Sequence, residues 1–327
     1  MTNAPVAIYT DPEGVDVRPA AELLRSSGFT VSIEDLRSEA ELIELVREAQ
    51  PEALLVTYLP VTEAVLAAAP SLRIVACSSV GYDHVDLAAA RRHDVWVCNV
   101  PDAATEEVAV SALAMALALI RHLPFLDRHV RDGGWDYAAA GWPPRPSQTT
   151  LGIFGLGRIG RRLADAAASV FGEIVGYDPA IPDAGWPTGV RRADFQECLE
   201  CSRVVSLHLP LSAQTTHLLD ADALELMPSG SYLINVSRGG LIDEAALVAA
   251  LDAGRLAGAA LDVTDPEPPP GDCVLRRHPR VLLTPHAAWL SAPANDAYVM
   301  RQAENVAAWW TQGHPKTPVG ATVEVAR

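Results

Sequence analysis

The sequence predicts an α/β protein with two domains, each a doubly wound parallel sheet, one of them discontinuous in the chain. Short apolar runs alternate with amphipathic segments over most of the 327 residues. Apolar strands that alternate with helices are typical of parallel sheets covered on both faces. A glycine-rich turn also joins one of these strands to an alanine-rich helix near the middle of the chain. The length is sufficient for two domains of this class.

The first hundred residues contain five runs that are typical of strands, with helical segments between them. The predicted strands are residues 6–9, 30–33, 53–57, 73–77 and 95–98. The predicted helices are residues 22–25, 41–49 and 85–92. Because strands and helices alternate, we expect a single parallel sheet in this part of the chain.

A long helix and a second set of strands follow. Ala and Leu fill most of residues 105–122, and this near-continuous apolarity predicts a helix buried between domains or subunits. A loop rich in Gly, Trp and Pro occupies residues 132–146. The strands predicted after the glycine-rich turn are residues 173–178, 203–208, 231–236, 258–263 and 281–284.

One more helix is predicted at about residues 294–310, after the last strand. A single helix does not make a domain, so we expect it to return to the first one. The predicted domains are therefore residues 1–99 together with 288–327, and residues 100–287.

Charge and composition argue against several classes of protein. The formal net charge is −16, which disfavours nucleic acid as a partner, because phosphates require a basic face. The sequence contains no run of about 18 or more apolar residues, so no membrane span is expected. The N-terminal residues also lack the pattern of a signal peptide. We therefore expect a cytoplasmic protein that contacts neither nucleic acid nor membrane.

The five cysteines are scattered along the chain, which indicates reduced thiols rather than a disulfide framework. Cys198 and Cys201 have a spacing that occurs in metal and redox sites. No second pair of Cys or His lies at ligand spacing in the sequence, so we interpret both as thiols on a helix and expect no metal.

The most informative motif is Gly155-x-Gly157-x-x-Gly160, between an apolar strand and a helix. The first glycine permits a tight turn, the second lets the backbone approach a pyrophosphate, and the third lets helix and strand pack closely. The helix N-terminus offers N–H groups to the phosphates. The next strand ends at Asp178, whose carboxylate can bind the adenosine ribose and repels a 2′-phosphate. The pattern predicts a Rossmann-like domain that binds NAD rather than NADP; the alternative is an ordinary glycine-rich turn.

Three later strand ends carry reactive side chains, within residues 235–240, 261–268 and 284–289. In open parallel sheets, ligands bind beyond the carboxyl ends of the strands. We therefore expect these three segments to converge beside the dinucleotide.

The side chains in these segments suit hydride transfer to a keto group. The guanidinium fork of Arg238 can bind a carboxylate and polarise the adjacent carbonyl. His286 can give a proton to the forming alkoxide, or take one in the reverse direction. Glu267 can hold the imidazole by one nitrogen and favour its protonated form, and Asp262 can hydrogen-bond the nicotinamide amide. The alternatives are a salt bridge for Arg238, a solvated turn for Glu267 and a core position for His286.

Six stretches of the chain match one enzyme family. They are Ser79-Val-Gly-Tyr-Asp83, Asn99-Val-Pro101, residues 151–160, Leu207-His-Leu-Pro-Leu211, Asn235-Val-Ser-Arg-Gly-Gly240 and Thr284-Pro-His286. Over essentially its whole length the chain resembles the D-isomer-specific 2-hydroxyacid dehydrogenases. The family's catalytic Arg, Glu and His fall on Arg238, Glu267 and His286. The resemblance implies an NAD-dependent oxidoreductase that reversibly reduces a 2-keto acid to a D-2-hydroxy acid.

The resemblance also implies how substrate, cofactor and subunits are arranged. The first domain should be a flavodoxin-like substrate domain in which Ser79, Val80 and Gly81 meet the substrate carboxylate. The active unit should be a homodimer, built largely through residues 105–148. The cofactor residues implied are Gly155, Gly157, Arg158, Ile159, Gly160, Asp178, His208, Pro210, Thr215, Val236, Asp262 and Thr105.

Two branches of the family are similar to this chain, and they predict different functions. Residues 284–289, with Trp289 toward the substrate pocket, resemble the C-terminal-binding-protein branch, whereas residues 261–264 and 79–83 look more like glyoxylate/hydroxypyruvate reductases. The corepressor branch has an Arg in its substrate loop where Cys77 stands here. We therefore keep two hypotheses. One is a dehydrogenase in which Trp289 selects 2-keto acids with an apolar or medium side chain; the alternative for Trp289 is a packing role only. The other is an NAD(H)-sensing dimeric interaction protein with little turnover.

Overall fold

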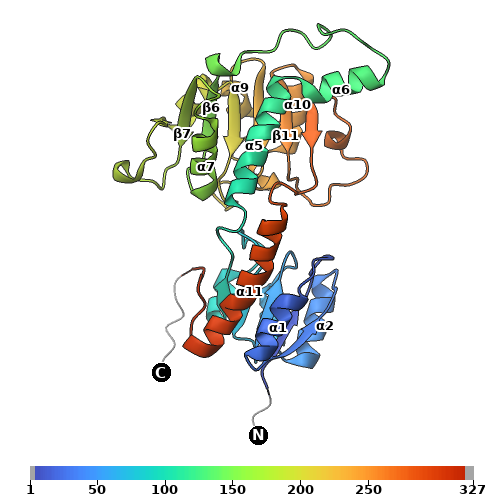
Figure 1. Cartoon of the computed structure of the whole chain (residues 1–327), viewed down its shortest axis with the longest axis vertical. Coiled ribbons are helices and arrows are strands. Elements are labelled where there is room, and N and C mark those ends of the chain that lie inside the picture. The colour runs from blue at the N-terminus through green and yellow to red at the C-terminus, as the bar shows by residue number, and fades with distance from the viewer. Residues whose placement is uncertain (1–3, 321–327) are drawn as a thin grey trace. The chain divides into compact units, whose positions relative to one another are not determined.

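The chain forms two units, and the computed structural model describes residues 4–320. The first, here called the terminal unit, ends at Ala103 and resumes at Ser291 (Figure 1). The second, the central unit, consists of residues 104–290. Each unit has its own sheet and its own hydrophobic core, so each is described by itself.

The observed unit boundaries lie a few residues beyond the predicted ones. Ala288, predicted to belong to the discontinuous domain, stays in the central unit, because its amide donates to the carboxylate of Asp262 and its carbonyl accepts from Ser111. Residues 1–3 and 321–327, which the sequence assigns to the discontinuous domain, lie outside the described residues.

The terminal unit contains a five-stranded parallel sheet with the order β2-β1-β3-β4-β5. All five expected strands form. β3 and β4 are buried along their whole length, as their uninterrupted apolar sequences predict. The strands are β1 (Val6–Tyr9), β2 (Thr30–Ile33), β3 (Ala53–Val56), β4 (Ile74–Cys77) and β5 (Trp96–Cys98).

Helices cover both faces of this sheet. α1 and α11 pack on one face, and α2, α3 and α4 pack on the other. Helices α2, α3 and α4 begin after Ser38, Thr62 and Asp86, whose side chains each accept a backbone N–H of the first turn. The helices are α1 (Arg18–Ser26), α2 (Glu39–Ala49), α3 (Glu63–Ala68), α4 (Leu87–Arg92) and α11 (Ala292–Gln312).

Helix α11 returns to the strands of the first hundred residues and is tied to them by a buried amide. The side chain of Gln302 donates to the carbonyl oxygens of Val56 and Ala76, at 3.1 and 2.8 Å. These carbonyls lie at the carboxyl ends of β3 and β4. The carbonyl oxygen of Val56 also accepts the amide of Ser78 at 2.8 Å, so Gln302 adds a link from α11 to the carboxyl ends of both strands and helps to hold the loops that follow them.

The central unit contains a seven-stranded sheet with the order β12-β11-β10-β9-β6-β7-β8, and its strands are all parallel. Together with the terminal unit, this confirms the predicted fold class. The strands are β6 (Thr150–Phe154), β7 (Glu173–Tyr177), β8 (Arg191–Arg192), β9 (Val204–Leu207), β10 (Ser231–Asn235), β11 (Leu256–Leu261) and β12 (Val281–Leu283).

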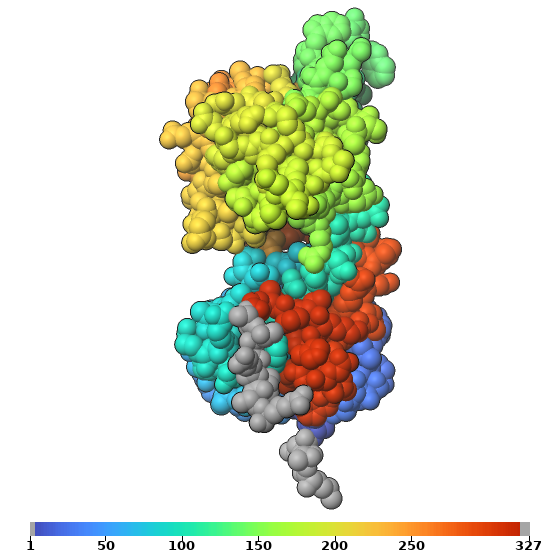
Figure 2. Space-filling view, turned by 90° about the vertical axis from the view of Figure 1, so that its left-hand side faces the viewer, coloured from blue at the N-terminus to red at the C-terminus, as the bar shows by residue number. Residues whose placement is uncertain are grey.

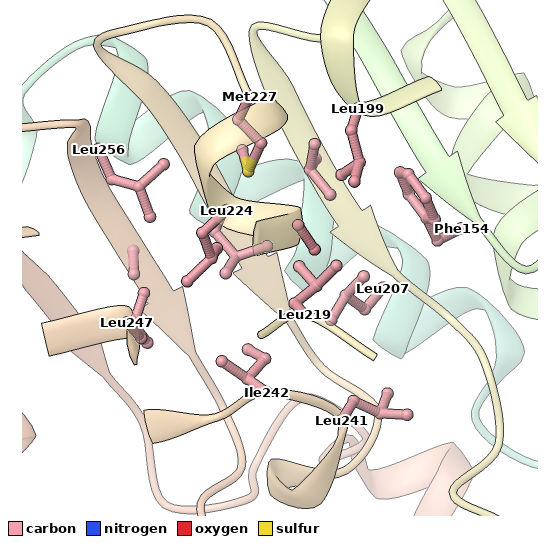
Figure 3. Packing of buried hydrophobic residues seen from close by; sticks show 14 of the residues in the cluster. Phe154, Leu199, Leu207, Leu219, Leu224, Met227, Leu241, Ile242, Leu247 and Leu256 are labelled. Carbon is pink, nitrogen blue, oxygen red and sulfur yellow. The ribbon is translucent and has the colours of Figure 1, made fainter. Parts of the chain in front are cut away.

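Helices α8, α9 and α10 cover one face of this sheet, where Leu207, Leu224 and Leu247 meet in a buried cluster (Figure 3). Helices α5 and α7 pack against each other and against β10, β11 and β6. The helices are α5 (Thr105–Ile120), α6 (Leu123–Arg131), α7 (Arg158–Ala167), α8 (Phe195–Cys201), α9 (Ala221–Leu226) and α10 (Glu244–Asp252). Short 3₁₀ turns are η1 (Pro146–Gln148), η2 (Asp183–Gly185), η3 (Gly239–Leu241) and η4 (Val274–Arg276).

Several elements escape sequence analysis. Helices α3, α8 and α9 have only six or seven residues, and two turns are too few to show a helical period. Helix α6 is not predicted, and the helix predicted for residues 105–122 ends at Ile120. His122 adopts a φ of 54°, in the left-handed region, and separates α5 from α6.

Within residues 4–320, no helix taken alone has the length and apolarity to span a membrane. Helices α5 and α6 meet those criteria only as a pair, bent by 60° where they join.

The strand order reverses at one point in each sheet, between β1 and β3 and between β6 and β9. Ligands of doubly wound folds bind at such points. In the terminal unit this point is filled by the buried carboxylate of Asp11, which accepts the amides of Thr57, Tyr58 and Leu59 at 2.9, 2.6 and 2.9 Å. These amides are therefore engaged by the protein itself, whereas the corresponding point of the central unit carries the glycine-rich turn.

Candidate active site and dinucleotide site

Three glycines shape the turn between β6 and α7. Gly155 has a φ of +94°, and a Cβ there would lie 2.6 Å from the carbonyl oxygen of His208. A Cβ on Gly160 would lie 2.0 Å from the carbonyl oxygen of Gly155, so helix and turn pack too closely for a side chain. A Cβ on Gly157 would meet no described atom within 4 Å. The turn is tight at Gly155 and Gly160 and open at Gly157, which fits a dinucleotide pyrophosphate at the N-terminus of α7.

Asp178 lies directly beside this turn. Its Oδ2 accepts a hydrogen bond from the amide of Leu156 at 2.8 Å, and its Oδ1 accepts one from the amide of Ala180 at 2.9 Å. In the first turn of α7, Arg158 is exposed and Ile159 is half-buried. The structure thus brings the predicted ribose-binding carboxylate and the predicted phosphate-binding turn together.

The loop after β9 carries three more residues predicted to bind cofactor. Thr215 Oγ1 donates to the carbonyl oxygen of Pro210 at 2.7 Å and accepts from the amide of Ser212 at 2.8 Å. His208 Nε2 lies 2.8 Å from Ser206 Oγ, and its buried Nδ1 has no hydrogen-bond partner among the described residues. Burial lowers the pKa of His208 to about 3, so its ring is neutral near pH 7.

The neutral His208 predicts a pH dependence of stability. Its pKa is about 3 in the folded chain and 6.5 without the fold, so between these values the unfolded state binds the proton more readily. The folded state therefore loses no stability at His208 above about pH 6.5. Below that pH the free energy of unfolding falls, by up to about 1.4 kcal/mol per pH unit, because the unfolded chain takes up the proton. We expect the urea midpoint of His208→Gln to fall less steeply from pH 6.5 to 4 than that of the wild type. Parallel pH curves for the two proteins would contradict this prediction.

Asp262, which follows β11 and is 2% exposed, holds the turn that carries His286. Its carboxylate accepts hydrogen bonds from Thr284 Oγ1 at 2.6 Å and from the amides of Ala287 and Ala288 at 2.9 and 2.8 Å. The amide of His286 donates to the carbonyl oxygen of Asp262 at 2.8 Å. These bonds hold His286 at a φ of 51°, a conformation that costs about 1–3 kcal/mol.

The carboxylate of Asp262, predicted to bind the nicotinamide amide, is mostly engaged by the protein itself. Three of its carboxylate's roughly four acceptor positions are used by the protein's own donors. The hydrogen bond to the nicotinamide amide, which stays a prediction, would use the remaining one. The structure adds a positioning role, because this carboxylate orders the backbone on either side of His286.

His286 and Glu267 are in direct contact. The imidazole Nδ1 lies 2.7 Å from Glu267 Oε2, and the other oxygen, Oε1, accepts the amide of Thr264 at 3.0 Å. A carboxylate accepts, so Nδ1 carries the proton and the tautomer of the ring is defined. The side chains of His286 and Glu267 are 27% and 34% exposed, so both can be reached by a small molecule.

Arg238 follows β10, the strand next to β11. Its carbonyl oxygen accepts the side-chain amide of Asn235 at 2.8 Å, and its Nη1 donates to the carbonyl oxygen of Ser237 at 2.8 Å. Arg238, Glu267 and His286 therefore follow three neighbouring parallel strands, β10, β11 and β12, at one edge of one sheet.

The remaining central-unit residues of the predicted site occupy three places. Val236 follows β10 and is 8% exposed, and Trp289 is half-buried on the segment that follows His286. Thr105 is the first residue of α5, whose first turn is linked to α7 by an ion pair between Glu106 and Arg162 at 3.0 Å.

The predicted substrate loop, Ser79 to Gly81, belongs to the terminal unit and follows β4. Its three carbonyl oxygens accept hydrogen bonds from the amide of Val100, from Asn99 Nδ2 and from Ser79 Oγ, at 2.9, 2.6 and 2.5 Å. The three amides make no backbone hydrogen bond to another described residue. Consecutive amides of this kind suit an anion such as a carboxylate.

Sequence reasoning does not find Thr264 or Ser237. The amide of Thr264 directs Glu267, and Ser237 Oγ donates to the carbonyl oxygen of Leu207 at 2.8 Å, which joins the loops after β9 and β10. An amide exists at every residue except proline, and serine is frequent in loops, so neither carries a signal in one sequence.

Among residues 4–320, no group of three or more His, Cys, Asp or Glu side chains is arranged to hold a metal ion. Cys198 and Cys201 lie on α8 as free thiols, the first buried and the second half-buried.

Comparisons with known proteins agree with this architecture. A sequence profile of the NAD-binding domain of D-isomer-specific 2-hydroxyacid dehydrogenases matches residues 113–288. A glyoxylate reductase of Korarchaeum cryptofilum is 37% identical over 279 residues, which is 83% of either chain.

Solved structures are similar over nearly the whole chain. A glyoxylate reductase from Paecilomyes thermophila has a TM-score of 0.88 at 26% identity and covers 97% of this chain and 98% of its own. A D-lactate dehydrogenase from Aquifex aeolicus, complexed with NAD and lactic acid, has a TM-score of 0.85 at 26% identity and covers 97% of this chain and 100% of its own.

Proposed function

Because this chain belongs to the D-isomer-specific 2-hydroxyacid dehydrogenase family, we propose that it reversibly reduces a 2-keto acid to a D-2-hydroxy acid with NADH. It is an NAD-dependent oxidoreductase, with the family's NAD-binding domain at residues 113–288. The observation that carries the proposal is the 2.7 Å contact between His286 and Glu267, at the sheet edge that also carries Arg238.

His286 is assigned the proton transfer. When bound, NADH supplies a hydride to the keto carbon, and the carbonyl oxygen gains a proton. His286 Nε2, the ring nitrogen that does not face Glu267, gives this proton and takes it back in the reverse direction. The carboxylate of Glu267 holds Nδ1–H and stabilises the positive charge of the protonated ring.

Arg238 is assigned to the substrate. Its guanidinium presents a planar fork that matches a carboxylate, and the same positive charge favours the developing negative charge on the neighbouring keto oxygen. The amides of Ser79, Val80 and Gly81 are assigned to the substrate carboxylate as well, since their carbonyls are held by other groups.

The remaining assignments concern selectivity. Asp178 favours NAD over NADP, because a 2′-phosphate would place two negative groups together beside the Leu156 amide. The half-buried ring of Trp289 is assigned to the wall that meets the substrate side chain, which favours keto acids with an apolar or medium group.

The function is tested by oxidation of NADH and NADPH against glyoxylate, hydroxypyruvate, pyruvate, phenylpyruvate and 4-methylthio-2-ketobutyrate. His286→Ala serves as the blank. We expect turnover with NADH on at least one of these acids that the variant loses. Tight NADH binding without turnover on any of them would favour the interaction protein instead.

Glu267→Gln tests the pairing with His286. Glutamine keeps the size of the side chain and removes the negative charge that favours the protonated ring. We expect the basic limb of the pH profile for reduction to move to lower pH, with a smaller kcat at pH 8 than at pH 6. Glu63→Gln is the matched control, because Glu63 also contacts a histidine, His93, at 2.7 Å in the terminal unit. A basic limb that stays in place would show that the pair does not control the proton.

We propose that the active unit is a homodimer formed through α6 and the loop that follows it. Figure 2 shows this segment, in green, standing out from the body of the central unit. Trp135, Tyr137 and Trp142 are 90%, 86% and 85% exposed in the single chain. Three exposed aromatic rings within so short a segment are typical of an interaction surface.

Sedimentation velocity tests this assembly. We expect a dimer for the wild type and a shift toward monomer for a variant in which Trp135, Tyr137 and Trp142 are replaced by serine. Trp310→Ser is the control, because its ring is 46% exposed on α11, outside this segment. A monomeric wild type would exclude the assignment.

We also place the enzyme in the cytoplasm, in keeping with five cysteines that are all free thiols. Fractionation of cells with an antibody to the chain tests this placement.

A further inference from the structure

The contact between Glu267 and His286 depends on a short piece of backbone. Glu267 Oε1 accepts the amide of Thr264 at 3.0 Å, and Thr264 Oγ1 donates to the carbonyl oxygen of Pro266 at 2.9 Å. This amide belongs to the peptide just before Thr264, so the carboxylate of Glu267 can present Oε2 to His286 only while Thr264, and with it the Thr264–Asp265 peptide that follows, keeps its place.

The segment after Arg238 packs closely against the Thr264–Asp265 peptide. A Cβ on Gly239 would lie 2.1 Å from the carbonyl carbon of Thr264, 2.3 Å from its oxygen and 2.6 Å from the amide nitrogen of Asp265. All three are backbone atoms, which cannot rotate away as the end of a side chain does. Gly239 begins the 3₁₀ turn η3, and it is buried.

The same segment also holds the peptide by a hydrogen bond. Glu244, the first residue of α10, accepts the amide of Asp265 through Oε1 at 3.1 Å. The backbone that directs Glu267 is thus fixed by contact with Gly239 on the carbonyl side and by hydrogen bonding to Glu244 on the amide side.

We propose that Gly239 and Glu244 are positioning residues that set the Glu267–His286 pair by fixing the Thr264–Asp265 peptide. Through this contact, the segment that carries Arg238 and the loop that carries Glu267 form one rigid body. The substrate-binding fork and the proton-transfer pair therefore keep a constant relation to each other. This inference rests on the function proposed above, since it concerns the same reaction.

Two adjacent glycines provide the test. Gly239→Ala must displace the Thr264–Asp265 peptide. By contrast, the three atoms nearest to a Cβ on Gly240 are side-chain atoms, Asp265 Oδ2 and Leu211 Cδ2 at 3.2 Å and Leu211 Cδ1 at 3.3 Å. We expect Gly239→Ala to lower kcat by about 10²-fold, as small displacements in active sites do. Its basic pH limb should move in the same direction as that of Glu267→Gln, with NADH affinity unchanged. Gly240→Ala should keep the wild-type pH profile.

Combining Gly239→Ala with Glu267→Gln distinguishes an effect on the Glu267–His286 pair from a general loss of active-site structure. If both act through the Glu267–His286 pair, the double variant should show no larger shift of the pH profile than Glu267→Gln alone. A Gly239→Ala protein that is folded and has the wild-type pH profile would overturn the proposal.

Glu244 gives a second test that does not depend on the folding of Gly239→Ala. Glu244→Gln keeps an oxygen that accepts the Asp265 amide, and Glu244→Ala does not. We expect the alanine variant to shift the pH profile and the glutamine variant to restore it. Equal profiles for wild type and Glu244→Ala would contradict the proposal. Asp222→Ala, at an exposed acid in the first turn of α9, controls for the loss of charge.

A readout without turnover separates this inference from the proposed function. Nitrogen-15 NMR of the histidine rings, with His286 assigned by its loss in His286→Ala, reports which ring nitrogen carries the proton. We expect an Nδ1-protonated ring in the wild type and in Gly240→Ala, and a mixture of tautomers in Glu244→Ala. If no keto acid is reduced and these spectra behave as expected, the proposed function fails and the positioning role stands. Unchanged spectra in Glu244→Ala, with turnover intact, would reject the positioning role alone.

Discussion

Replacing His286 with alanine is expected to lower kcat for keto-acid reduction by about 10²–10⁴-fold, which is the usual contribution of a general acid. The affinity for NADH should not change, because no dinucleotide contact is assigned to the imidazole. The fold should persist, since the side chain is 27% exposed and the turn is held by Asp262 through backbone amides. Steady-state kinetics and titration of NADH fluorescence measure the two quantities.

His93→Ala is the matched control for this variant. His93 also contacts a glutamate, Glu63, at 2.7 Å, and its side chain is 29% exposed, close to the value for His286. It lies at the end of α4, outside the proposed active site. We expect wild-type kcat for His93→Ala. A similar loss in both variants, or wild-type kcat in His286→Ala, would exclude His286 as the acid.

Replacing Arg238 with alanine is expected to raise KM for the keto acid and to lower kcat as well. The fork is assigned both to the substrate carboxylate and to the keto oxygen, so its loss weakens binding and the transition state together. Removing one partner of such a charge pair costs about 2–5 kcal/mol, which corresponds to about 30- to 5,000-fold in kcat/KM. Kinetics over a range of keto-acid concentrations separate the two effects.

Two further variants define the cause of that loss. Arg238→Lys keeps the charge and removes the planar fork, so it should recover only part of the activity. Arg47→Ala, at an exposed position on α2, should leave both constants unchanged. A rise in KM alone would show that Arg238 anchors the substrate and does not polarise the carbonyl.

Most of the fold is predictable because its signals are local. β3 and β4 are four-residue apolar runs between polar turns, and each is buried at every residue. The glycine spacing after β6 predicts a tight turn without knowledge of any distant residue, and the φ of +94° at Gly155 agrees with it. By contrast, α3 and α9 have six residues each, too few to show a period, and the break at His122 depends on a single backbone conformation.

The candidate site divides in the same way. Arg238, Glu267 and His286 are candidates from the sequence, because their residue types suit the chemistry and they stand at strand ends in family motifs. Asp262 is predictable as a carboxylate at a strand end, but its three donors come from residues 22 to 26 positions later. Its positioning role therefore becomes visible only when β11 and β12 lie side by side.

Most strands and the longer helices, the family and the candidate reactive residues follow from the amino-acid sequence, because they depend on local patterns and motifs along the chain. The direction in which each carboxylate points follows only from the tertiary structure. The amide of Thr264 orients Glu267, the amide of Asp265 is held by Glu244, and Gly239 acts through the absence of a side chain. Backbone groups are common to all residues, so such contacts leave no pattern in a sequence and arise only when distant segments pack together.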